Sequence, residues 1–341
     1  MLDGRGRPMR PGRQVRSTVT TSSGRAPDRM LAVSQDVAGT PDVLKIIEME
    51  RPVPTLGEIL VRVHAAGVNP TDWKTRARGQ FATGALPPFV LGFDVSGVVE
   101  EVGPGVTLFA PGDEVFGMPR FPHPAGAYAE FVTAPARHFC RKPTNIDHTT
   151  AAALPLASLT AWQALVDTAD IQPGQRVLVH AAAGGVGHLA VQIAKARGAR
   201  VVGTASAGKH DLLRGLGADE LIDYTTEDFG VLRDIDVVLD TVGGDYTPRS
   251  LRTLRRGGIL ISLLPMAPDF PVDLAEELDV RATRILVEPD HAGMKAVADL
   301  VARRQLRPLV DTTLPLREAA RAHERGETNS TTGKIVLSVV A

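Results

Sequence analysis

The sequence contains a single cysteine, Cys140, among its 341 residues. One thiol excludes an intrachain disulfide framework and every thiolate-rich zinc site, and it is typical of a protein in a reducing cytoplasm. Long hydrophobic runs are missing too: no segment reaches the roughly 18 uncharged apolar residues that span a bilayer, and the N-terminus lacks the apolar core of a secretory signal. We therefore expect a cytoplasmic protein with no membrane partner.

An excess of charge of either sign is also absent. The chain has 38 Lys and Arg against 39 Asp and Glu, for a net charge of -1. Without a basic field, nucleic acid is not an expected partner. The composition, 43% hydrophobic and 23% charged, is that of a globular protein of about two domains.

The hydrophobic pattern divides the chain into segments of different kinds. Residues 1–29 are rich in Arg, Gly, Pro, Ser and Thr and predict a disordered tail, with an Arg-rich transit peptide as the alternative. Residues 30–153 show short alternating runs broken by Gly and Pro, which favour an antiparallel, barrel-like β domain. Residues 154–289 alternate strands and helices, and 290–341 return to the β style.

Several strands of the middle segment contain consecutive Val and Ile, as expected for parallel strands covered by helices on both faces. We therefore expect a doubly wound α/β domain at 154–289, inserted into a β domain made of 30–153 and 290–341. The predicted strands are 176–180, 200–204, 220–223, 235–240, 258–263 and 284–287, and helices are expected at 157–169 and near 291–304.

The first of these strands, "RVLVH", leads into the loop and helix "AAAGGVGHLAVQIAKARG". Gly185, Gly187 and Ala190 match G-x-G-x-x-A in the strand, loop, helix context that a dinucleotide fingerprint requires. Small residues let the backbone approach a pyrophosphate, and the helix N-terminus directs N–H groups toward it. The alternative is a glycine turn needed only for packing. The helix is expected to expose Gln192 and Lys195.

An acid is missing where the second strand of the fingerprint ends. An Asp or Glu there contacts a free ribose 2'-hydroxyl, whereas it would repel a 2'-phosphate. This chain has "GTASAGKH", with the hydroxyls of Thr204 and Ser206 and the cation of Lys209. The pattern favours NADPH as the cofactor. In the alternative, Ser206 only caps the next helix and Lys209 is solvated.

From Met30 onward, the chain resembles the medium-chain dehydrogenase/reductase superfamily, in its zinc-independent quinone oxidoreductase branch. The matching stretches are "GEILVRVHAAGVNPTDWK", "LGFDVSGVVEEVG", "GDEVFG", "GAYAEF", "AAALPLASLTAWQAL", "AAAGGVG", "LGADELIDY" and "GKIVL". The resemblance implies a GroES-like β-barrel catalytic domain, discontinuous around a Rossmann domain, with the active site between them. It also implies a homodimer joined through the Rossmann sheet edge near 284–287.

Zinc-dependent members of that superfamily carry a catalytic Cys where this chain has "AGVNPTD", and a His-Glu pair where it has "GFDVSG". Asn69 and Asp94 stand near those places, the cysteine-rich structural lobe is absent, and no His pair has zinc spacing. We expect no metal. Substrates that carry their own electron sink, namely quinones and α,β-unsaturated carbonyl compounds, then remain feasible.

The resemblance also implies contacts with the cofactor. Thr160 is expected beside the nicotinamide, and the glycine loop, Gly184, Gly185, Val186 and Gly187, at the pyrophosphate. The residues expected at the 2'-phosphate are Ser206, Lys209 and Tyr224, and those expected at the adenosine are Thr241, Val242 and Gly243. Leu263 and Leu264 are expected at the carboxamide, with Lys334 nearby. A core tyrosine and a surface lysine are the alternatives for Tyr224 and Lys334.

For the substrate we single out Asn69, as a hydrogen-bond donor to a developing oxyanion, and Trp73, as a surface that stacks on a flat ring. Asn69 is alternatively a turn residue before Pro70. Several quinone reductases have a tyrosine near the position of Trp73, so a phenolic proton donor is in doubt here. For Asp72 three roles stay open: capping a helix, forming an ion pair, or taking part in the reaction. Tyr128 is expected to be structural.

These features favour an NADPH-dependent, zinc-independent reductase of quinones or activated double bonds with a small-molecule substrate. One alternative is an enoyl reductase acting on a carrier-bound or coenzyme A-bound intermediate, for which Arg76 and Arg78 could form a basic rim if they are not simply solvated. The other is a non-catalytic NADPH-binding sensor.

Overall fold

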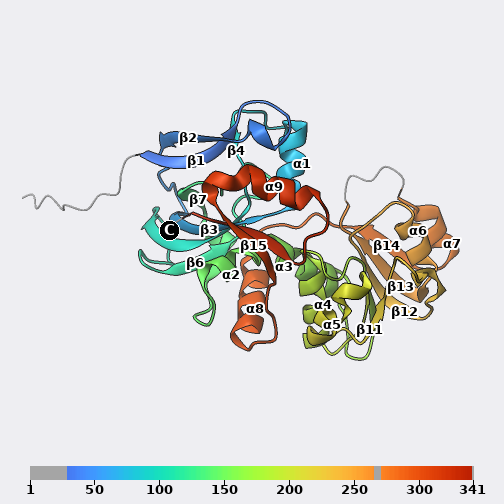
Figure 1. Ribbon diagram of the computed structural model, residues 1–341. Helices are drawn as coiled ribbons and strands as arrows, with labels where there is room; N and C mark the ends of the chain where they lie inside the picture. The colour runs from blue at the N-terminus through green and yellow to red at the C-terminus, as the bar shows by residue number, and fades with distance from the viewer. Residues whose placement is uncertain (1–28, 265–269, 340–341) are drawn as a thin grey trace, which may run out of the picture.

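The computed structural model describes residues 29–264 and 270–339, so almost all of the predicted tail lies outside the described residues. The described chain forms three sheets, two in one half of the molecule and one in the other (Figure 1). Among the described residues, no helix has the length and apolar character that crossing a bilayer requires.

The first half of the molecule contains a small sheet and a larger one. The small sheet has the order β2 (Lys45–Glu50), β1 (Arg29–Gln35), β4 (Phe89–Val90). The larger, seven-stranded sheet has the order β15 (Val310–Pro315), β16 (Lys334–Ser338), β3 (Glu58–Val68), β5 (Asp94–Val102), β6 (Glu114–Gly117), β8 (Phe139–Arg141), and β7 (Phe131–Pro135) also pairs with β3. Its strands come from both ends of the chain, as the β-rich segments of the sequence predict.

The other half contains a six-stranded sheet in which every pairing is parallel. Its order is β11 (Glu220–Ile222), β10 (Arg200–Thr204), β9 (Arg176–Val179), β12 (Ile235–Asp240), β13 (Leu254–Ser262), β14 (Arg281–Arg284). The strand order reverses between β9 and β12, and ligands of such sheets bind at the carboxyl ends of the strands beside that point. The predicted GroES-like domain with a Rossmann sheet is confirmed.

The helices are α1 (Pro70–Arg78), α2 (His148–Ala152), α3 (Pro155–Trp162), α4 (Gly187–Ala196), α5 (His210–Gly215), α6 (Tyr246–Leu251), α7 (Val272–Glu277), α8 (His291–Ala302) and α9 (Ala319–Glu327). Short 3-10 turns are η1 (Pro41–Val43), η2 (Ala136–His138), η4 (Ala207–Lys209), η5 (Phe229–Val231) and η6 (Leu316–Glu318). A π-helical segment, η3 (Gln163–Thr168), continues α3 where the sequence predicts one longer helix.

The last strand of the parallel sheet lies three residues earlier than predicted. The apolar residues of 284–287 suggested a strand, but β13 pairs with Arg281–Arg284. Val287 is buried in the main hydrophobic core, and Ile285 packs against that core. The apolar run therefore follows the edge strand instead of forming it.

The prediction that α4 exposes Gln192 is wrong. Only 5% of Gln192 is exposed, because its amide bonds to the backbone of Arg307 in both directions: Nε2 donates to the carbonyl at 2.9 Å and Oε1 accepts from the N–H at 3.0 Å. One turn earlier, Nε2 of His188 accepts from the N–H of Leu309 at 3.0 Å. These bonds join α4 to the segment before β15.

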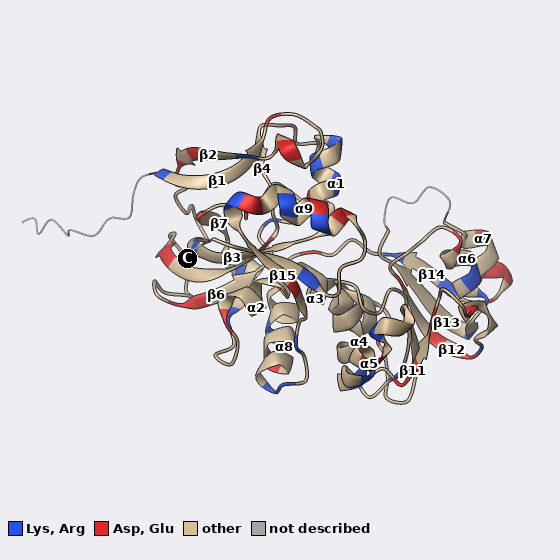
Figure 2. Cartoon of the chain, viewed as in Figure 1, with Lys and Arg blue, Asp and Glu red and all other residues tan. Residues whose placement is uncertain are grey.

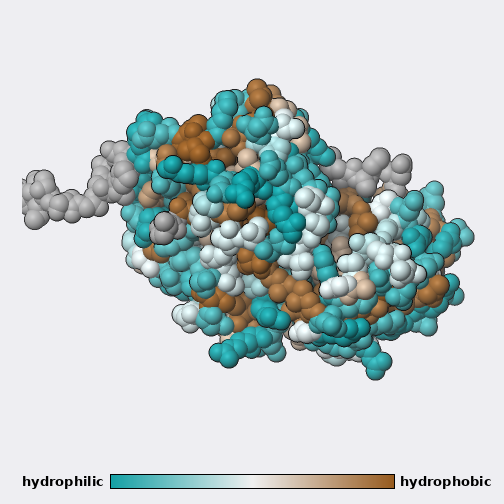
Figure 3. All heavy atoms as spheres, in the orientation of Figure 1, coloured by the Kyte–Doolittle hydropathy of each residue, from teal (hydrophilic) through white to brown (hydrophobic). Residues whose placement is uncertain are grey.

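Charged and apolar residues are dispersed over the molecule. Lys and Arg alternate with Asp and Glu in both halves (Figure 2), in keeping with the balanced composition. Hydrophilic and hydrophobic residues are likewise interspersed on the visible face (Figure 3).

Candidate functional site

The glycine loop connects β9 to α4 at the carboxyl edge of the parallel sheet. A Cβ atom on Gly187 would lie 2.3 Å from the carbonyl oxygen of Ala181, so only glycine fits there. A Cβ on Gly185 would meet Cδ of Lys334 at 3.4 Å. The N–H of Gly333 donates to the carbonyl of Ala183 at 2.9 Å, which brings the start of β16 against this loop. The loop thus borders the other half of the molecule.

At the end of the second strand, the structure shows where the residues predicted to meet the 2'-phosphate lie. Ser206 precedes η4 and makes no cap bond with its side chain, so the capping alternative is not supported. Lys209 contacts the carbonyl of Thr331 at 3.4 Å. Tyr224 is 50% exposed, which excludes the core alternative. Thr204 is buried and accepts from the N–H of Ala181 at 3.2 Å, so it serves the fold and not a ligand.

A buried carboxylate shapes the loop after β12. Oδ1 of Asp240 accepts from the N–H groups of Val242 at 3.0 Å and Gly243 at 2.8 Å, and Oδ2 accepts from Oγ1 of Thr247 at 2.6 Å. Gly243 has a φ of 75°, which favours glycine. Sequence reasoning missed Asp240, although an acid that ends an apolar strand was the available signal.

The remaining predicted cofactor residues lie around the same edge. The N–H of Leu263 donates to the carbonyl of Asp240 at 2.9 Å, and the side chain of Leu264 lies over Gly243. Thr160, on α3, is buried, and its Oγ1 donates to the carbonyl of Leu156 at 2.7 Å. Oγ1 of Thr241 donates to the carbonyl of His180 at 2.9 Å.

Three polar side chains meet next to the glycine loop. Nδ2 of Asn69 donates to Oδ2 of Asp94 at 2.8 Å, Nζ of Lys334 lies 3.3 Å from the same oxygen, and Lys334 also donates to Oδ1 of Asn69. Oδ1 of Asp94 accepts from the N–H of Leu156 at 2.7 Å. All three side chains are buried, Lys334 with 3% exposed. The surface alternative for Lys334 is therefore excluded.

Sheet register explains why these three residues meet. Strand β3 pairs on one side with β5, where Gly67 lies opposite Asp94, and on the other with β16, where Val68 lies opposite Ile335. Asn69 follows the end of β3, so it lies between the first residues of the two neighbouring strands. We call Asn69, Asp94 and Lys334 the polar cluster.

The polar cluster does not fit a zinc ion. An amide is a weak ligand compared with a thiolate, and the ammonium of Lys334 already holds a positive charge at the one carboxylate present. Among residues 29–264 and 270–339, no group of three or more His, Cys, Asp or Glu side chains is placed to hold a metal ion. Cys140 is buried and belongs to no such group of side chains, and burial raises the pKa of its thiol.

Helix α1 carries the other predicted substrate residue. Trp73 is half-buried; it packs closely against Gly326 of α9, and its ring lies 6.4 Å from that of His323. Both interpretations of Arg76, as part of a basic rim or of a solvated face, are wrong: it is 2% exposed and pairs with Glu327 of α9 at 2.5 Å. Arg78 is exposed.

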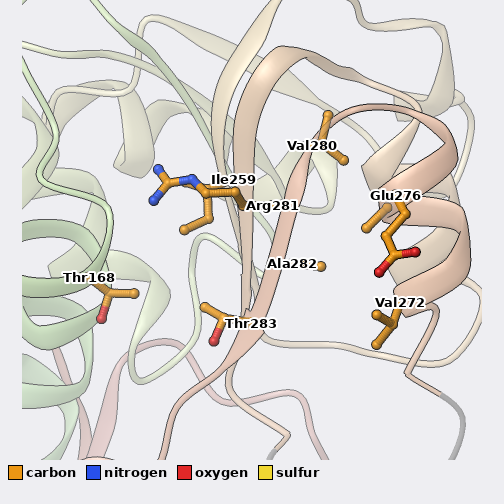
Figure 4. Close-up of a pocket in the computed structure, with 9 residues that line it drawn as sticks. Thr168, Ile259, Val272, Glu276, Val280, Arg281, Ala282 and Thr283 are labelled. Carbon is orange, nitrogen blue, oxygen red and sulfur yellow. The ribbon is translucent and has the colours of Figure 1, made fainter.

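A hollow of about 460 Å³ lies elsewhere, at the β14 edge of the parallel sheet (Figure 4). Its lining includes Val272 and Glu276 of α7 and Ala282 and Thr283 of β14. It belongs to neither the glycine loop nor the polar cluster.

Comparison with known proteins agrees with this architecture. Residues 55–144 match the alcohol dehydrogenase GroES-like domain, and residues 216–337 match the zinc-binding dehydrogenase family. The chain is 36% identical over 324 residues to a 2-haloacrylate reductase of Burkholderia sp, covering 88% of this chain and 96% of that protein. It is 36% identical over 332 residues to the chloroplastic NADPH-dependent alkenal/one oxidoreductase of Arabidopsis thaliana, covering 93% of this chain and 81% of that protein.

A solved quinone oxidoreductase from Coxiella burnetii has a similar structure, with a TM-score of 0.85 and 37% sequence identity, and the match covers 92% of this chain and all of that one. The domain matches, the sequence identities and the structural similarity all indicate the same family. The chain belongs to the medium-chain dehydrogenase/reductase superfamily, in the branch of quinone oxidoreductases and alkenal reductases, and is an NAD(P)H-dependent reductase of that type.

Proposed function

We propose that this protein is an NADPH-dependent, zinc-independent reductase of quinones or α,β-unsaturated carbonyl compounds. The observation that carries the proposal is the polar cluster, a buried cation held by an amide and a carboxylate beside the glycine loop. The relatives named above act, by their names, on a haloacrylate, on alkenals and alkenones, and on quinones. Such substrates carry their own electron sink.

The chain's own groups would bind the cofactor and orient the substrate. The loop Gly184, Gly185, Val186 and Gly187 would hold the pyrophosphate, and Thr160, Thr241 to Gly243, Leu263 and Leu264 would line the rest of the cofactor. When bound there, NADPH would supply a hydride for the β-carbon of an enone or for the quinone ring, and water would supply the proton.

Charge then develops on the substrate oxygen, and the polar cluster is the proposed group that stabilises it. An ammonium has three hydrogens, of which contacts with Asn69 and Asp94 use two, and the amide nitrogen of Asn69 keeps its second hydrogen after donating to Asp94. Fixed donors in a water-poor site stabilise an oxyanion at little reorganisation cost. Trp73, the other proposed substrate residue, offers a flat ring on α1, the helix that begins directly after Asn69.

We expect the purified protein to oxidise NADPH in the presence of quinones or enones. The initial rate at 340 nm is measured with a panel of both acceptors, with NADH in place of NADPH, and with a chelator. Turnover that prefers NADPH and resists the chelator supports the proposal. Tight NADPH binding without turnover on any acceptor contradicts it and favours a carrier-bound substrate or a sensor.

The cofactor preference has its own test in Lys209→Met. Ser206, Lys209 and Tyr224 are the proposed contacts of the 2'-phosphate, and losing one charge-assisted bond of about 1.5–3 kcal/mol raises the Km for NADPH by roughly tenfold or more. The Km for NADH should not change, because that cofactor has no 2'-phosphate. The matched control is Lys295→Met, on the exposed face of α8. Equal effects on both cofactors would contradict the assignment.

We further propose a cytoplasmic homodimer joined at β14. Among the described strands, β14 is the last in the parallel sheet, and the edge strand of a sheet is a surface on which a second copy can add a strand. The molar mass in solution tests the assembly, and a value of one chain at micromolar concentration would contradict it.

A further inference from the structure

His188 is a buried histidine that the proposed reaction does not use. It lies in the first turn of α4, directly after the glycine loop, and it is fully buried. Both nitrogens of its ring have partners: Nδ1 lies 2.8 Å from the carbonyl oxygen of Gly184, and Nε2 lies 3.0 Å from the backbone nitrogen of Leu309. One partner belongs to the proposed cofactor loop, and the other belongs to the segment before β15.

The two partners determine where the hydrogen of the ring lies. A backbone N–H only donates, so Nε2 must accept from Leu309, and a carbonyl oxygen only accepts, so Nδ1 must donate to Gly184. The imidazole is then neutral, with its one hydrogen on Nδ1. Burial, which lowers the pKa of His188 to about 4, agrees with the neutral state.

The bond to Gly184 fixes the direction of a peptide group in the glycine loop. In a trans peptide, the carbonyl of one residue and the N–H of the next point in opposite directions. His188 holds the Gly184 carbonyl with Nδ1 and also with its backbone N–H at 3.2 Å, so the N–H of Gly185 must point away from the ring. In the part of the chain that the structure describes, the N–H groups of Gly185, Val186 and Gly187 donate to no protein acceptor, so they remain available to a pyrophosphate.

The bond to Leu309 leads to the polar cluster. The carbonyl of Leu309 accepts from the backbone N–H of Lys334 at 2.8 Å. The side chain of Lys334 then passes the glycine loop, where its Cδ lies 3.4 Å from a Cβ placed on Gly185, and its Nζ reaches Asp94 at 3.3 Å. Leu309 therefore connects the ring of His188 to the residue that carries the ammonium of the proposed oxyanion site.

The neighbouring Gln192 supports the same segment by separate bonds. One turn later on α4, its amide bonds to the backbone of Arg307 in both directions. The segment before β15 should therefore stay against α4 when the bond from His188 is removed. Substitutions of His188 can thus be tested in a folded protein.

We propose that His188 is a positioning residue, which holds the glycine loop and the ammonium of Lys334 in one fixed arrangement. This inference rests on the proposed function, in which the loop binds NADPH and the polar cluster stabilises the substrate oxyanion. On one side of the ring, Nδ1 orients the N–H groups proposed to meet the pyrophosphate. On the other side, Nε2 places Leu309 and, through it, the start of β16.

Two substitutions separate the two bonds of the ring. The amide of asparagine takes the place of Nδ1, so His188→Asn keeps a donor for Gly184 and loses the acceptor for Leu309. The amide of glutamine reaches the place of Nε2, so His188→Gln keeps an acceptor for Leu309 and loses the donor for Gly184. A third variant, His188→Leu, loses both bonds.

The dissociation constant of NADPH and the kcat should respond to different variants. We expect His188→Gln to raise the Kd and the Km for NADPH by roughly three- to tenfold, the size of one hydrogen bond, with kcat close to that of wild type. His188→Asn should instead lower kcat by a similar factor and leave the Kd unchanged, and His188→Leu should show both effects. Unchanged constants in all three variants, or equal changes of both constants in the Asn and Gln variants, would overturn the proposal.

The matched control is His291→Gln on α8. Nδ1 of His291 also donates to a backbone carbonyl, that of Phe139 at 2.7 Å, but this bond lies outside the glycine loop and the polar cluster. The control should therefore leave both the Kd for NADPH and kcat as in wild type. Urea unfolding is measured for every variant, and a loss of stability in the His188 variants with neither constant changed would show a purely structural role and overturn the proposal.

The nitrogen-15 NMR spectrum of the His188 ring gives a readout that needs neither substrate nor turnover. At pH 7, Nδ1 should give the signal of a protonated nitrogen and Nε2 that of an unprotonated one. The opposite assignment, or two protonated nitrogens, would overturn the role of His188 and leave the proposed function in place. If wild type binds NADPH but reduces no acceptor, the proposed function fails alone, and the NMR spectrum and the Kd of His188→Gln still decide on the role of His188.

Discussion

Replacing Gly187 by alanine is expected to abolish measurable NADPH binding and to lower the free energy of unfolding by about 1–3 kcal/mol, as for other overpacked interiors. The added Cβ would lie 2.3 Å from the carbonyl oxygen of Ala181 and 2.8 Å from Cα of Ala182. Both are backbone atoms, and the N–H of Ala182 is tied to the carbonyl of Thr204 at 2.9 Å. The loop must therefore move, and with it the N–H groups proposed to meet the pyrophosphate.

Binding is measured by fluorescence titration with NADPH and stability by urea unfolding. The matched control is Gly215→Ala at the end of α5, where nothing lies within 4 Å of the added Cβ. That variant should gain up to about 1 kcal/mol, because alanine is the better helix former. If Gly187→Ala binds NADPH as wild type does, the glycine loop is not the pyrophosphate site.

Replacing Lys334 by methionine is expected to cost about 3–5 kcal/mol of unfolding free energy, since it leaves Asp94 buried without its cation. Turnover should fall at least a hundredfold, because the proposed oxyanion site loses its only ammonium. Methionine keeps the length of the stem, so packing against the glycine loop is preserved. Urea unfolding and the kcat with the best acceptor provide the two measurements.

A double variant separates the two effects of Lys334→Met. Adding Asp94→Asn removes the uncompensated charge, so much of the lost stability should return while turnover stays low. Lys295→Met, an exposed pair with Asp299 on α8, should change stability by no more than about 1 kcal/mol. A Lys334→Met protein with wild-type kcat would contradict the role of the polar cluster in the reaction.

The sequence predicts a structural feature well when the residues that determine it are neighbours along the chain. The glycine loop and the strand over 235–240 are specified by neighbouring residues, and both lie where the sequence predicts them. The polar cluster joins residues 25 and 240 positions from Asp94, and only the register of β3 with β5 and β16 brings them together. The spacing of these residues along the chain does not reveal which strands pair or in which register.

The burial of two polar residues on helices could not be predicted from the sequence for a related reason. Arg76 and Gln192 stand in patterns typical of solvated helix faces, yet α9 covers the first and the segment before β15 covers the second. Whether a polar side chain is buried depends on a partner that arrives from far along the chain. The long side chain of Gln192 forms hydrogen bonds with the backbone of its partner, and that of Arg76 forms an ion pair. An apolar side chain could do neither.

The bonds from His188 and Gln192 to the segment before β15 have a mechanical consequence. They pin the first two turns of α4 to the opposite domain, immediately behind the glycine loop. Separating the two halves of the molecule at this point would break all three hydrogen bonds at once and leave the buried side chains of His188 and Gln192 without these partners. The position of the glycine loop is therefore tied to residues that lie more than a hundred positions later in the sequence.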